Sequence, residues 1–321
     1  MNEEFINKVI CGDCLEILPK IKSNSIDLIV TDPPYNINKT EWDNLGNTEK
    51  YTNWCIKWIK ECERVLKKNG TLWFFHTKFH TISRLNILIE DKTNFRFKQF
   101  IIINKGLQSV AGRTCPTLRS FPKATEYLLF YTFEDITGTQ QLSDKYAKIN
   151  PMAKYLKEEF RRAKITNKKI ASLFPSKTGG MTGCVSNWLL GYNFPTKEQY
   201  EKMREYLNGE YLRKEYEDLR YVFNLPYGIT DIWKINFYED NINGHLTVKP
   251  EKLIWNIIKV ASNENQIILD PFLGSGTTAV VCKKLNRNFI GIEINPEYCK
   301  IAEERLKKLP ERLDNILRLK S

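Results

Sequence analysis

The sequence predicts an α/β protein built on a doubly wound, mostly parallel sheet. Short apolar runs of strand length alternate with segments in which apolar residues recur every three or four positions, as in helices. One run leads into a glycine-rich turn and a helix-like segment, and four runs end in an acidic residue: Asp13, Asp32, Asp270 and Glu293. Ligands of such sheets collect at the carboxyl ends of the strands, so these acids are expected at one shared site.

The elements of the first 139 residues follow from this pattern. Strands are predicted at residues 8–14, 26–31, 71–75, 100–103 and 127–131. An apolar stripe from Tyr51 to Leu66 predicts one helix, which we expect to end at Asn69-Gly70. The aromatic residues of this stripe are interpreted as core rather than as a stacking surface.

Asp32-Pro33-Pro34-Tyr35 ends the apolar run over residues 26–31 and is the most informative motif of the chain. Prolines fix φ and lack an N–H group, so the main chain bends and its carbonyl oxygens stay available as acceptors. The Asp32 carboxylate can accept a hydrogen bond from an exocyclic amine, and the Tyr35 ring can stack on a base. The motif therefore suits a flipped-out base, although taken alone it is equally an ordinary turn.

A strand, a glycine-rich turn and a helix start follow one another near the C-terminus. The turn is Asp270-Pro271-Phe272-Leu273-Gly274-Ser275-Gly276-Thr277-Thr278. Its glycines allow a ligand to approach the backbone closely, and the N–H groups of a helix start favour polar or anionic ligand atoms. The next strand, residues 288–293, ends in Glu293, 23 residues after Asp270. Nucleotide-binding folds place a carboxylate on ribose hydroxyls at about this spacing.

Together the two motifs resemble the amino-methyltransferases of DNA that use S-adenosylmethionine, in the permuted group whose catalytic motif precedes the cofactor motif. The resemblance covers most of the chain and implies a circularly permuted, Rossmann-like sheet. It implies a catalytic motif formed by Asp32, Pro33, Pro34 and Tyr35. It also implies that Glu293 binds the ribose of the cofactor, and that its methionine part is held by Asp270, Phe272, Gly274, Ser275, Gly276 and Thr277.

A second segment carries the same resemblance. His245-Leu246-Thr247-Val248-Lys249-Pro250 is similar to the family's His-Pro-Thr-Gln-Lys-Pro segment, which lies against the cofactor. It departs from that pattern at two positions, so only Thr247 and Lys249 are assigned cofactor contacts. Lys249-Pro250-Glu251 is also an ordinary helix start, and both interpretations can hold.

A permuted sheet requires the two chain ends to supply neighbouring strands. A helix is predicted over residues 296–309, with Asn295 as its cap and Pro296 in its first turn. The strand that continues the sheet is then expected from residues 8–14. Asp13, at its end, would lie beside the adenine of the cofactor or cap the helix that follows, and the two roles are compatible.

Composition favours an acidic polymer as the partner, although proteins that never bind nucleic acid can carry a similar excess of charge, and the resemblance implies that this polymer is double-stranded DNA. The chain carries 49 Lys and Arg against 38 Asp and Glu, a net charge of +11. No apolar run reaches membrane-spanning length, and scattered cysteines predict a reducing, cytoplasmic setting. Cys11-x-x-Cys14 has no second pair and the chain has three histidines, so no metal site is predicted.

Residues 140–231 are predicted to form a helical, basic target-recognition insert between a catalytic half, 1–139, and a cofactor-binding half, 232–321. Between residues 152 and 192, eight basic residues face two acidic ones. Predicted helices at 155–163, 166–174, 184–191 and 196–207 resemble a helix-turn-helix domain with an unusually long turn. Candidate DNA contacts are Lys168, Lys169, Lys177, Thr182, Ser186 and Asn187. The alternative is a helical insertion that only packs on the catalytic domain.

The sequence thus predicts a DNA methyltransferase that acts on adenine N6. Methylation of cytosine N4 is the first alternative, because within the family Asp at position 32 is a preference of adenine enzymes and not a proof. A catalytically inactive, sequence-specific DNA-binding regulator is the second. The recognised sequence, a homodimer and a companion restriction endonuclease are left open.

Overall fold

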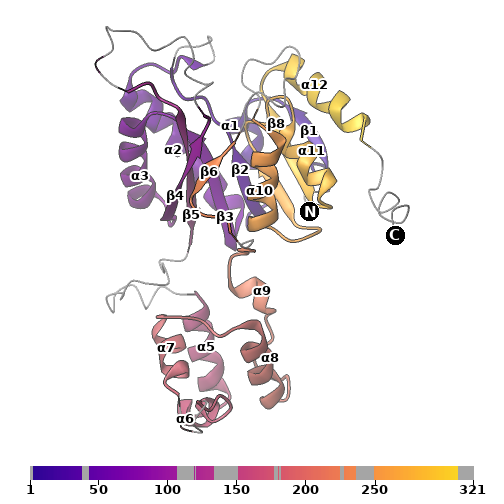
Figure 1. Cartoon of the computed structure of the whole chain (residues 1–321). Coiled ribbons are helices and arrows are strands. Elements are labelled where there is room, and N and C mark those ends of the chain that lie inside the picture. The colour runs from indigo at the N-terminus through magenta and orange to yellow at the C-terminus, as the bar shows by residue number, and fades with distance from the viewer. Residues whose placement is uncertain are drawn as a thin grey trace. The chain divides into compact units, whose positions relative to one another are not determined.

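The computed structural model describes residues 3–37, 43–106, 119, 121–133, 151–176, 180, 182–224, 228–235 and 249–309. The chain divides into two compact units, residues 1–131 with 222–321, and residues 132–221. Figure 1 shows a sheet flanked by helices in the first unit and a group of helices in the second.

The first unit contains one eight-stranded sheet in the order β1-β8-β7-β2-β3-β5-β4-β6. Its strands are β1 (Lys8–Cys11), β2 (Ile26–Thr31), β3 (Leu66–His76), β4 (Arg96–Asn104), β5 (Thr125–Thr132), β6 (Ile232–Lys234), β7 (Ile267–Asp270) and β8 (Asn288–Glu293). All neighbours from β1 to β3 pair in parallel, as do β4 and β6, whereas β3 and β5 are antiparallel. The predicted α/β class with a mostly parallel sheet is confirmed.

Two groups of helices cover this sheet. The helices are α1 (Cys14–Ile17), α2 (Thr48–Val65), α3 (Phe79–Lys92), α10 (Glu251–Ala261), α11 (Thr277–Lys284) and α12 (Pro296–Lys307), with a 3-10 turn at Leu18–Lys20. Contacts link α1 with α2 and α2 with α3, and separately α10 with α11 and α11 with α12. Figure 1 shows the two groups on different sides of the sheet, as expected of a doubly wound fold.

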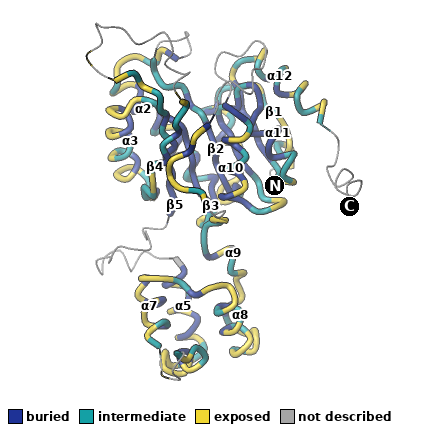
Figure 2. The backbone as a smooth tube through the Cα atoms, viewed as in Figure 1, coloured by how far each residue is buried: buried dark blue, intermediate teal, exposed yellow. Residues whose placement is uncertain are grey.

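The central strand β2 is buried along its whole length (Figure 2), which explains its apolar sequence. The one acid inside it, Asp27, receives hydrogen bonds from Lys67 Nζ at 2.7 Å and from the Ile267 backbone N–H at 2.9 Å. The second bond ties β2 to the start of β7. A buried carboxylate is tolerated here because both of its oxygens have partners.

The prediction that the helix continues to Asn69-Gly70 was wrong, because α2 ends at Val65 and β3 begins at once. The pairing of β2 with β3 shifts register between Ile26 and Leu28. A Cβ atom at Gly70 would lie 2.6 Å from Leu66 Cγ and 2.9 Å from the Asp27 carbonyl oxygen. Gly70 is therefore required by close packing at this irregularity and not by a helix end.

The two ends of the chain meet in the sheet. β1 pairs in parallel with β8, from Lys8 opposite Ile290 to Cys11 opposite Glu293. The Gly12 N–H continues this pairing with a 2.9 Å hydrogen bond to the Glu293 carbonyl. The strand ends that carry Asp13 and Glu293 thus lie at the same edge.

The second unit packs its helices around its own core. They are α5 (Pro151–Arg162), α6 (Asn167–Ala171), α7 (Cys184–Leu190), α8 (Lys197–Tyr206) and α9 (Tyr216–Leu219). The core includes Leu156, Phe160, Ile170, Val185, Trp188, Tyr200 and Met203. Thr166 caps α6 by accepting a hydrogen bond from the Lys169 N–H, and Thr196 forms a capping box with Gln199 at the start of α8.

Within the described part of the chain, no helix has the length and apolar character needed to span a bilayer. No cluster of three or more His, Cys, Asp or Glu side chains suited to a metal ion occurs among the same residues.

Candidate active site

The Asp32 carboxylate is held by two donors. The Tyr35 hydroxyl donates a hydrogen bond to Asp32 Oδ1, and Lys249 Nζ donates to Oδ2 at 2.6 Å. Lys249 comes from the segment directly before α10, and its Nζ also lies 3.3 Å from the Tyr35 hydroxyl oxygen. The structure therefore brings three of the predicted site residues together at the end of β2.

A second carboxylate, Glu126 on β5, completes this cluster. Its Oε2 lies 3.5 Å from Lys249 Nζ, and its Oε1 accepts a 3.1 Å hydrogen bond from Lys105 Nζ. Glu126 and Lys249 are both buried. The sequence patterns gave no indication that a strand residue near position 126 would belong to the site.

Burial and charge compete at these three groups. Burial raises the pKa of Asp32, the Lys249 ammonium lowers it, and Glu126 adds repulsion, so the pKa stays above its usual value. Burial opposes the charge of Lys249, but Asp32 and Glu126 together raise its pKa. Burial would raise the pKa of Glu126, yet Lys249 and Lys105 hold it below its usual value. Lys249 therefore stays charged between two carboxylates.

The proline corner is held from outside by a tyrosine and a histidine. The Tyr51 hydroxyl, on α2, donates to the Pro34 carbonyl oxygen at 2.7 Å and lies 3.0 Å from His76 Nε2. No described group donates to the Pro33 carbonyl. Both Tyr51 and His76 are buried, and the sequence interpretation treated Tyr51 as apolar core. A buried tyrosine hydroxyl needs a partner, and that requirement is the signal that was missed.

The glycine-rich turn adjoins the Asp-Pro-Pro-Tyr motif through hydrogen bonds. The Thr31 hydroxyl donates to Asp270 Oδ1 at 2.7 Å, and the Thr278 hydroxyl donates to Oδ2 at 2.6 Å. The Phe272 N–H also donates to Oδ1, at 3.1 Å. Burial raises the pKa of Asp270 to about 7, although these hydrogen bonds oppose the shift. Asp270 thus fastens the turn to β2.

The other end of the turn is tied to β8 and α12. The Gly274 N–H donates to Glu293 Oε2 at 2.7 Å, and the Asn295 N–H donates to Oε1 at 2.8 Å. Gly276 has φ +85°, and a Cβ atom there would lie 2.6 Å from the Ala302 Cβ, so only glycine fits. The structure therefore groups the residues predicted to hold the cofactor: Asp270, Phe272, Gly274, Ser275, Gly276, Thr277 and Glu293.

The turn, the start of α11 and the end of β8 offer three features that fit S-adenosylmethionine. No side chain of the described residues caps the N-terminus of α11, so its first N–H groups remain available to an anionic group. Burial raises the pKa of Glu293, whose remaining lone pairs can accept from hydroxyl groups. Ile294, the next residue, exposes 61% of its surface although it is apolar, as suits a flat ring.

Asp13 and Thr247 were also predicted to contact the cofactor. Asp13 caps α1 by accepting a 2.8 Å hydrogen bond from the Leu15 N–H, which leaves a cofactor contact as a prediction. Thr247 lies outside the described residues.

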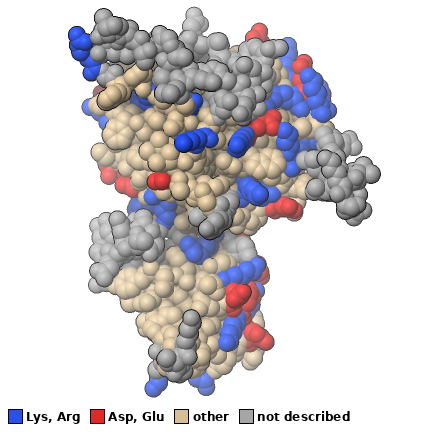
Figure 3. Space-filling view, viewed as in Figure 1, with Lys and Arg blue, Asp and Glu red and all other residues tan. Residues whose placement is uncertain are grey.

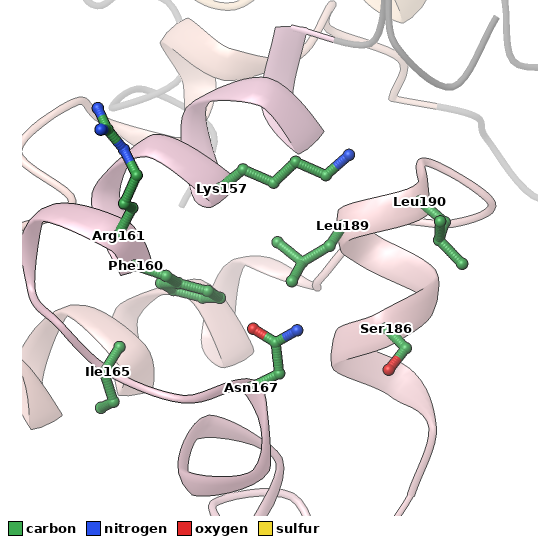
Figure 4. A pocket seen from close by; sticks show the side chains of 8 residues that line it. All are labelled: Lys157, Phe160, Arg161, Ile165, Asn167, Ser186, Leu189 and Leu190. Atoms are coloured by element: carbon green, nitrogen blue, oxygen red, sulfur yellow. The ribbon is translucent and has the colours of Figure 1, made fainter. Parts of the chain in front are cut away.

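The second unit carries an open groove with a cavity volume of about 510 Å³ (Figure 4). Phe160 of α5 and Leu189 of α7 approach it from opposite helices. The other lining residues are Lys157, Arg161, Ile165, Asn167, Ser186 and Leu190. In the face shown in Figure 3, basic side chains are interleaved with acidic ones rather than gathered in one patch.

The residues predicted to contact DNA all belong to the second unit, and they differ in how exposed they are. Lys168, Lys169, Ser186 and Asn187 are exposed. The Thr182 hydroxyl is engaged inside the turn, where it donates to the Phe174 carbonyl at 2.9 Å. Lys177 lies outside the described residues.

Proteins of known function match almost the whole chain. M.HpaI, a type II methyltransferase of Haemophilus parainfluenzae, is 29% identical over 96% of this chain and 77% of its own length. The type II methyltransferase M1.MboII of Moraxella bovis is 27% identical over 95% and 98%. The DNA adenine methyltransferase YhdJ of Escherichia coli K12 is 29% identical over 93% and 82%.

Solved structures share the fold. The M1.HpyAVI complex with S-adenosylmethionine matches with a TM-score of 0.53 at 22% identity, over 94% of this chain and 99% of that one. The cytosine-N4-specific PvuII DNA methyltransferase matches with a TM-score of 0.56 at 16% identity, over 94% and 88%. The family model described as DNA methylase, for the N6 and N4 enzymes, matches residues 26–304. The chain therefore belongs to the N6/N4 DNA methylase family.

Proposed function

We propose that this protein methylates the N6 amino group of adenine in double-stranded DNA, on a base that has left the helix. The observation that carries the proposal is the position of Asp32, which directly follows the residue hydrogen-bonded to Asp270 of the glycine-rich turn. An acceptor for the amine and a turn suited to the methyl donor thus share one sheet edge.

The donor is S-adenosylmethionine, which supplies a methyl group on a positively charged sulfur. The glycine-rich turn and the start of α11 would hold its amino-acid part, Glu293 its ribose, and Asp13 with Ile294 the side of its adenine. The arrangement of β1 beside β8 supports a circularly permuted sheet as the origin of this site.

The chain's own residues prepare the amine. The amino lone pair of adenine is delocalised into the ring, which makes the nitrogen a poor nucleophile. Hydrogen bonds from its two hydrogens to Asp32 and to the Pro33 carbonyl favour a pyramidal nitrogen and localise that lone pair. Asp32 has room for this bond, because a carboxylate offers about four lone-pair sites and Tyr35 and Lys249 use two.

Asp32 can also accept the proton that the nitrogen releases. Its raised pKa makes it a stronger base than an exposed aspartate. The Tyr35 ring stacks on the base and offsets part of the unstacking cost, about a few kcal/mol. Positioning and electrostatics therefore account for catalysis without a covalent enzyme intermediate.

The basic helical unit is proposed to recognise the target sequence. We assign this role to residues 140–231, between catalytic residues 1–139 and cofactor-binding residues 232–321. Exposed lysines on α6 and exposed polar residues on α7 support a DNA contact. The names of the type II relatives support a role in restriction-modification, which would place the protein in the cytoplasm with its DNA.

One experiment tests the proposal. The protein is incubated with labelled S-adenosylmethionine and DNA of mixed sequence, and the DNA is digested to nucleosides. We expect label in N6-methyladenine, and none with Asp32→Ala. Label in N4-methylcytosine would overturn the choice of base, and the absence of label with a folded protein would favour an inactive DNA-binding regulator.

A further inference from the structure

We propose that Tyr51 and His76 are positioning residues, which act through the Pro34 carbonyl to fix the corner that presents Asp32 and Tyr35 to the base. The inference rests on the proposed function and adds two residues to it. Neither residue belongs to the two sequence motifs. Tyr51 lies on α2 and His76 is the last residue of β3.

The corner formed by Asp32-Pro33-Pro34-Tyr35 has few backbone torsions that can rotate freely. The proline rings fix φ at Pro33 and Pro34. Asp32 and Pro33 each precede a proline, which confines both to extended ψ values. The remaining soft torsion between Asp32 and Tyr35 is therefore ψ of Pro34, and this angle sets the direction in which the chain enters Tyr35.

The Tyr51 hydroxyl fixes that torsion. ψ of Pro34 also sets the direction of the Pro34 carbonyl, and this carbonyl accepts a 2.7 Å hydrogen bond from Tyr51. Tyr51 exposes 1% of its surface, so water does not compete for the bond. The Pro33 carbonyl, one peptide earlier, has no described donor and stays available to the amine.

His76 determines the direction of the Tyr51 hydroxyl. The Lys78 backbone N–H donates to His76 Nδ1 at 3.1 Å, which places the imidazole proton on Nε2. His76 Nε2–H then donates to the Tyr51 oxygen at 3.0 Å, so the Tyr51 proton points to Pro34. Burial, with the nearby Lys123 and Lys78, lowers the pKa of His76 to about 3, and the ring stays neutral.

The same histidine also contacts the stacking residue. The centroids of the His76 and Tyr35 rings lie 5.1 Å apart, with the rings tilted by 39°. One buried side chain therefore touches the Tyr35 ring and orients the hydroxyl that fixes its backbone. Loss of either contact should loosen the pair formed by Asp32 and Tyr35.

The first test compares two tyrosine-to-phenylalanine variants. Tyr51→Phe removes the bond to Pro34, and Tyr131→Phe is the control. Tyr131 is also fully buried in the first unit, and its hydroxyl donates to Asn86 at 2.9 Å, away from Asp32. We expect Tyr51→Phe to slow single-turnover methyl transfer about 10- to 100-fold, because small misplacements at a reacting centre have such effects. Thermal midpoints and cofactor affinity should match those of the control.

A second pair of variants separates positioning from folding. His76→Gln keeps an N–H donor near the Nε2 position, whereas His76→Leu removes it. We expect the glutamine variant to transfer methyl groups faster than the leucine variant at equal thermal midpoint. Fluorescence of 2-aminopurine at the target base should report weaker extrusion in His76→Leu. Equal transfer rates in both variants, or a Tyr51→Phe rate equal to that of the control, would overturn the proposal.

Nitrogen NMR of the histidines tests the relay of hydrogen bonds from His76 through Tyr51 to Pro34, and it requires no catalysis. The chain contains three histidines to assign. We expect His76 to carry its proton on Nε2, with exchange that becomes faster in Tyr51→Phe. A proton on Nδ1 would contradict the relay. If the wild-type protein transfers no methyl group, the proposed function fails, while the NMR measurement still decides whether His76 and Tyr51 hold the Pro34 carbonyl.

Discussion

The Thr31 hydroxyl donates a 2.7 Å hydrogen bond to Asp270 Oδ1, and through it the strand that ends in Asp32 is joined to the glycine-rich turn. The two residues are 239 positions apart in the chain. Their strands, β2 and β7, are neighbours in the sheet. This bond therefore couples the two halves of the proposed site.

Thr31→Val should weaken that coupling at nearly constant volume. Among the described donors, Asp270 Oδ1 would keep the Phe272 N–H and lose Thr31, and loss of a buried hydrogen bond to a charged or polar partner costs about 1–3 kcal/mol. Chemical denaturation at neutral pH measures the loss. Thr52→Val is the control, since its buried hydroxyl donates to the Glu49 carbonyl within α2. Equal losses in the two variants would contradict a special role of Thr31.

Asp270 should also give stability a particular pH dependence. Its pKa in the folded protein, about 7, lies above the value of about 3.9 for an unfolded aspartate. Between these values the folded state binds more protons, so this group's contribution is full below the unfolded pKa and is lost as pH rises through about 7. Asp270→Asn should flatten the decline in unfolding free energy over this window. An unchanged slope in the variant would contradict the raised pKa.

Lys249 should determine the pH at which activity is lost on acidification, which is the acid limb of the pH–activity profile. Asp32 must be ionised to accept the amine, so activity is expected above its pKa and lost as pH falls through it. Lys249 lowers that pKa, so Lys249→Met should raise it further and move the acid limb to higher pH. Lys249→Arg keeps the charge and should move the limb less. Single-turnover rates across a pH series provide the measurement.

Cofactor affinity separates this role of Lys249 from the contact implied by its sequence motif. If Lys249→Met weakens binding of S-adenosylmethionine and leaves the acid limb in place, the lysine serves the cofactor instead. A shifted limb with unchanged affinity assigns it to Asp32.

Local sequence signals predicted much of the fold. The cap Asn295 is correct because capping depends on residues within one turn. The ends of β2 and β8 are correct because a buried strand followed by a polar turn is also a local pattern. The start of β3 was missed because it depends on the register with β2, which no short window contains.

The site residues that the sequence patterns did not predict were missed for a different reason. Glu126 lies beside Lys249, and Lys105 beside Glu126, only because of the strand order of the sheet, in which β5 runs beside β3 in the opposite direction. Tyr51 occupies a position on an apolar helical stripe, where a core tyrosine and a hydrogen-bonded one have the same periodicity. Such roles become visible only when distant elements are placed side by side.

The exposed lysines of the second unit give the last prediction. Replacement of Lys168, Lys169 and Lys177 by Ala should weaken DNA binding and flatten its salt dependence, because each lost phosphate contact lowers the slope by about 0.9. Affinity for S-adenosylmethionine should stay unchanged, since these residues belong to a different compact unit from the glycine-rich turn. The control replaces Lys252 and Lys300, two exposed lysines of the first unit, by Ala. Binding isotherms at several salt concentrations decide the matter: if the triple variant keeps the wild-type slope, these lysines do not form the docking surface.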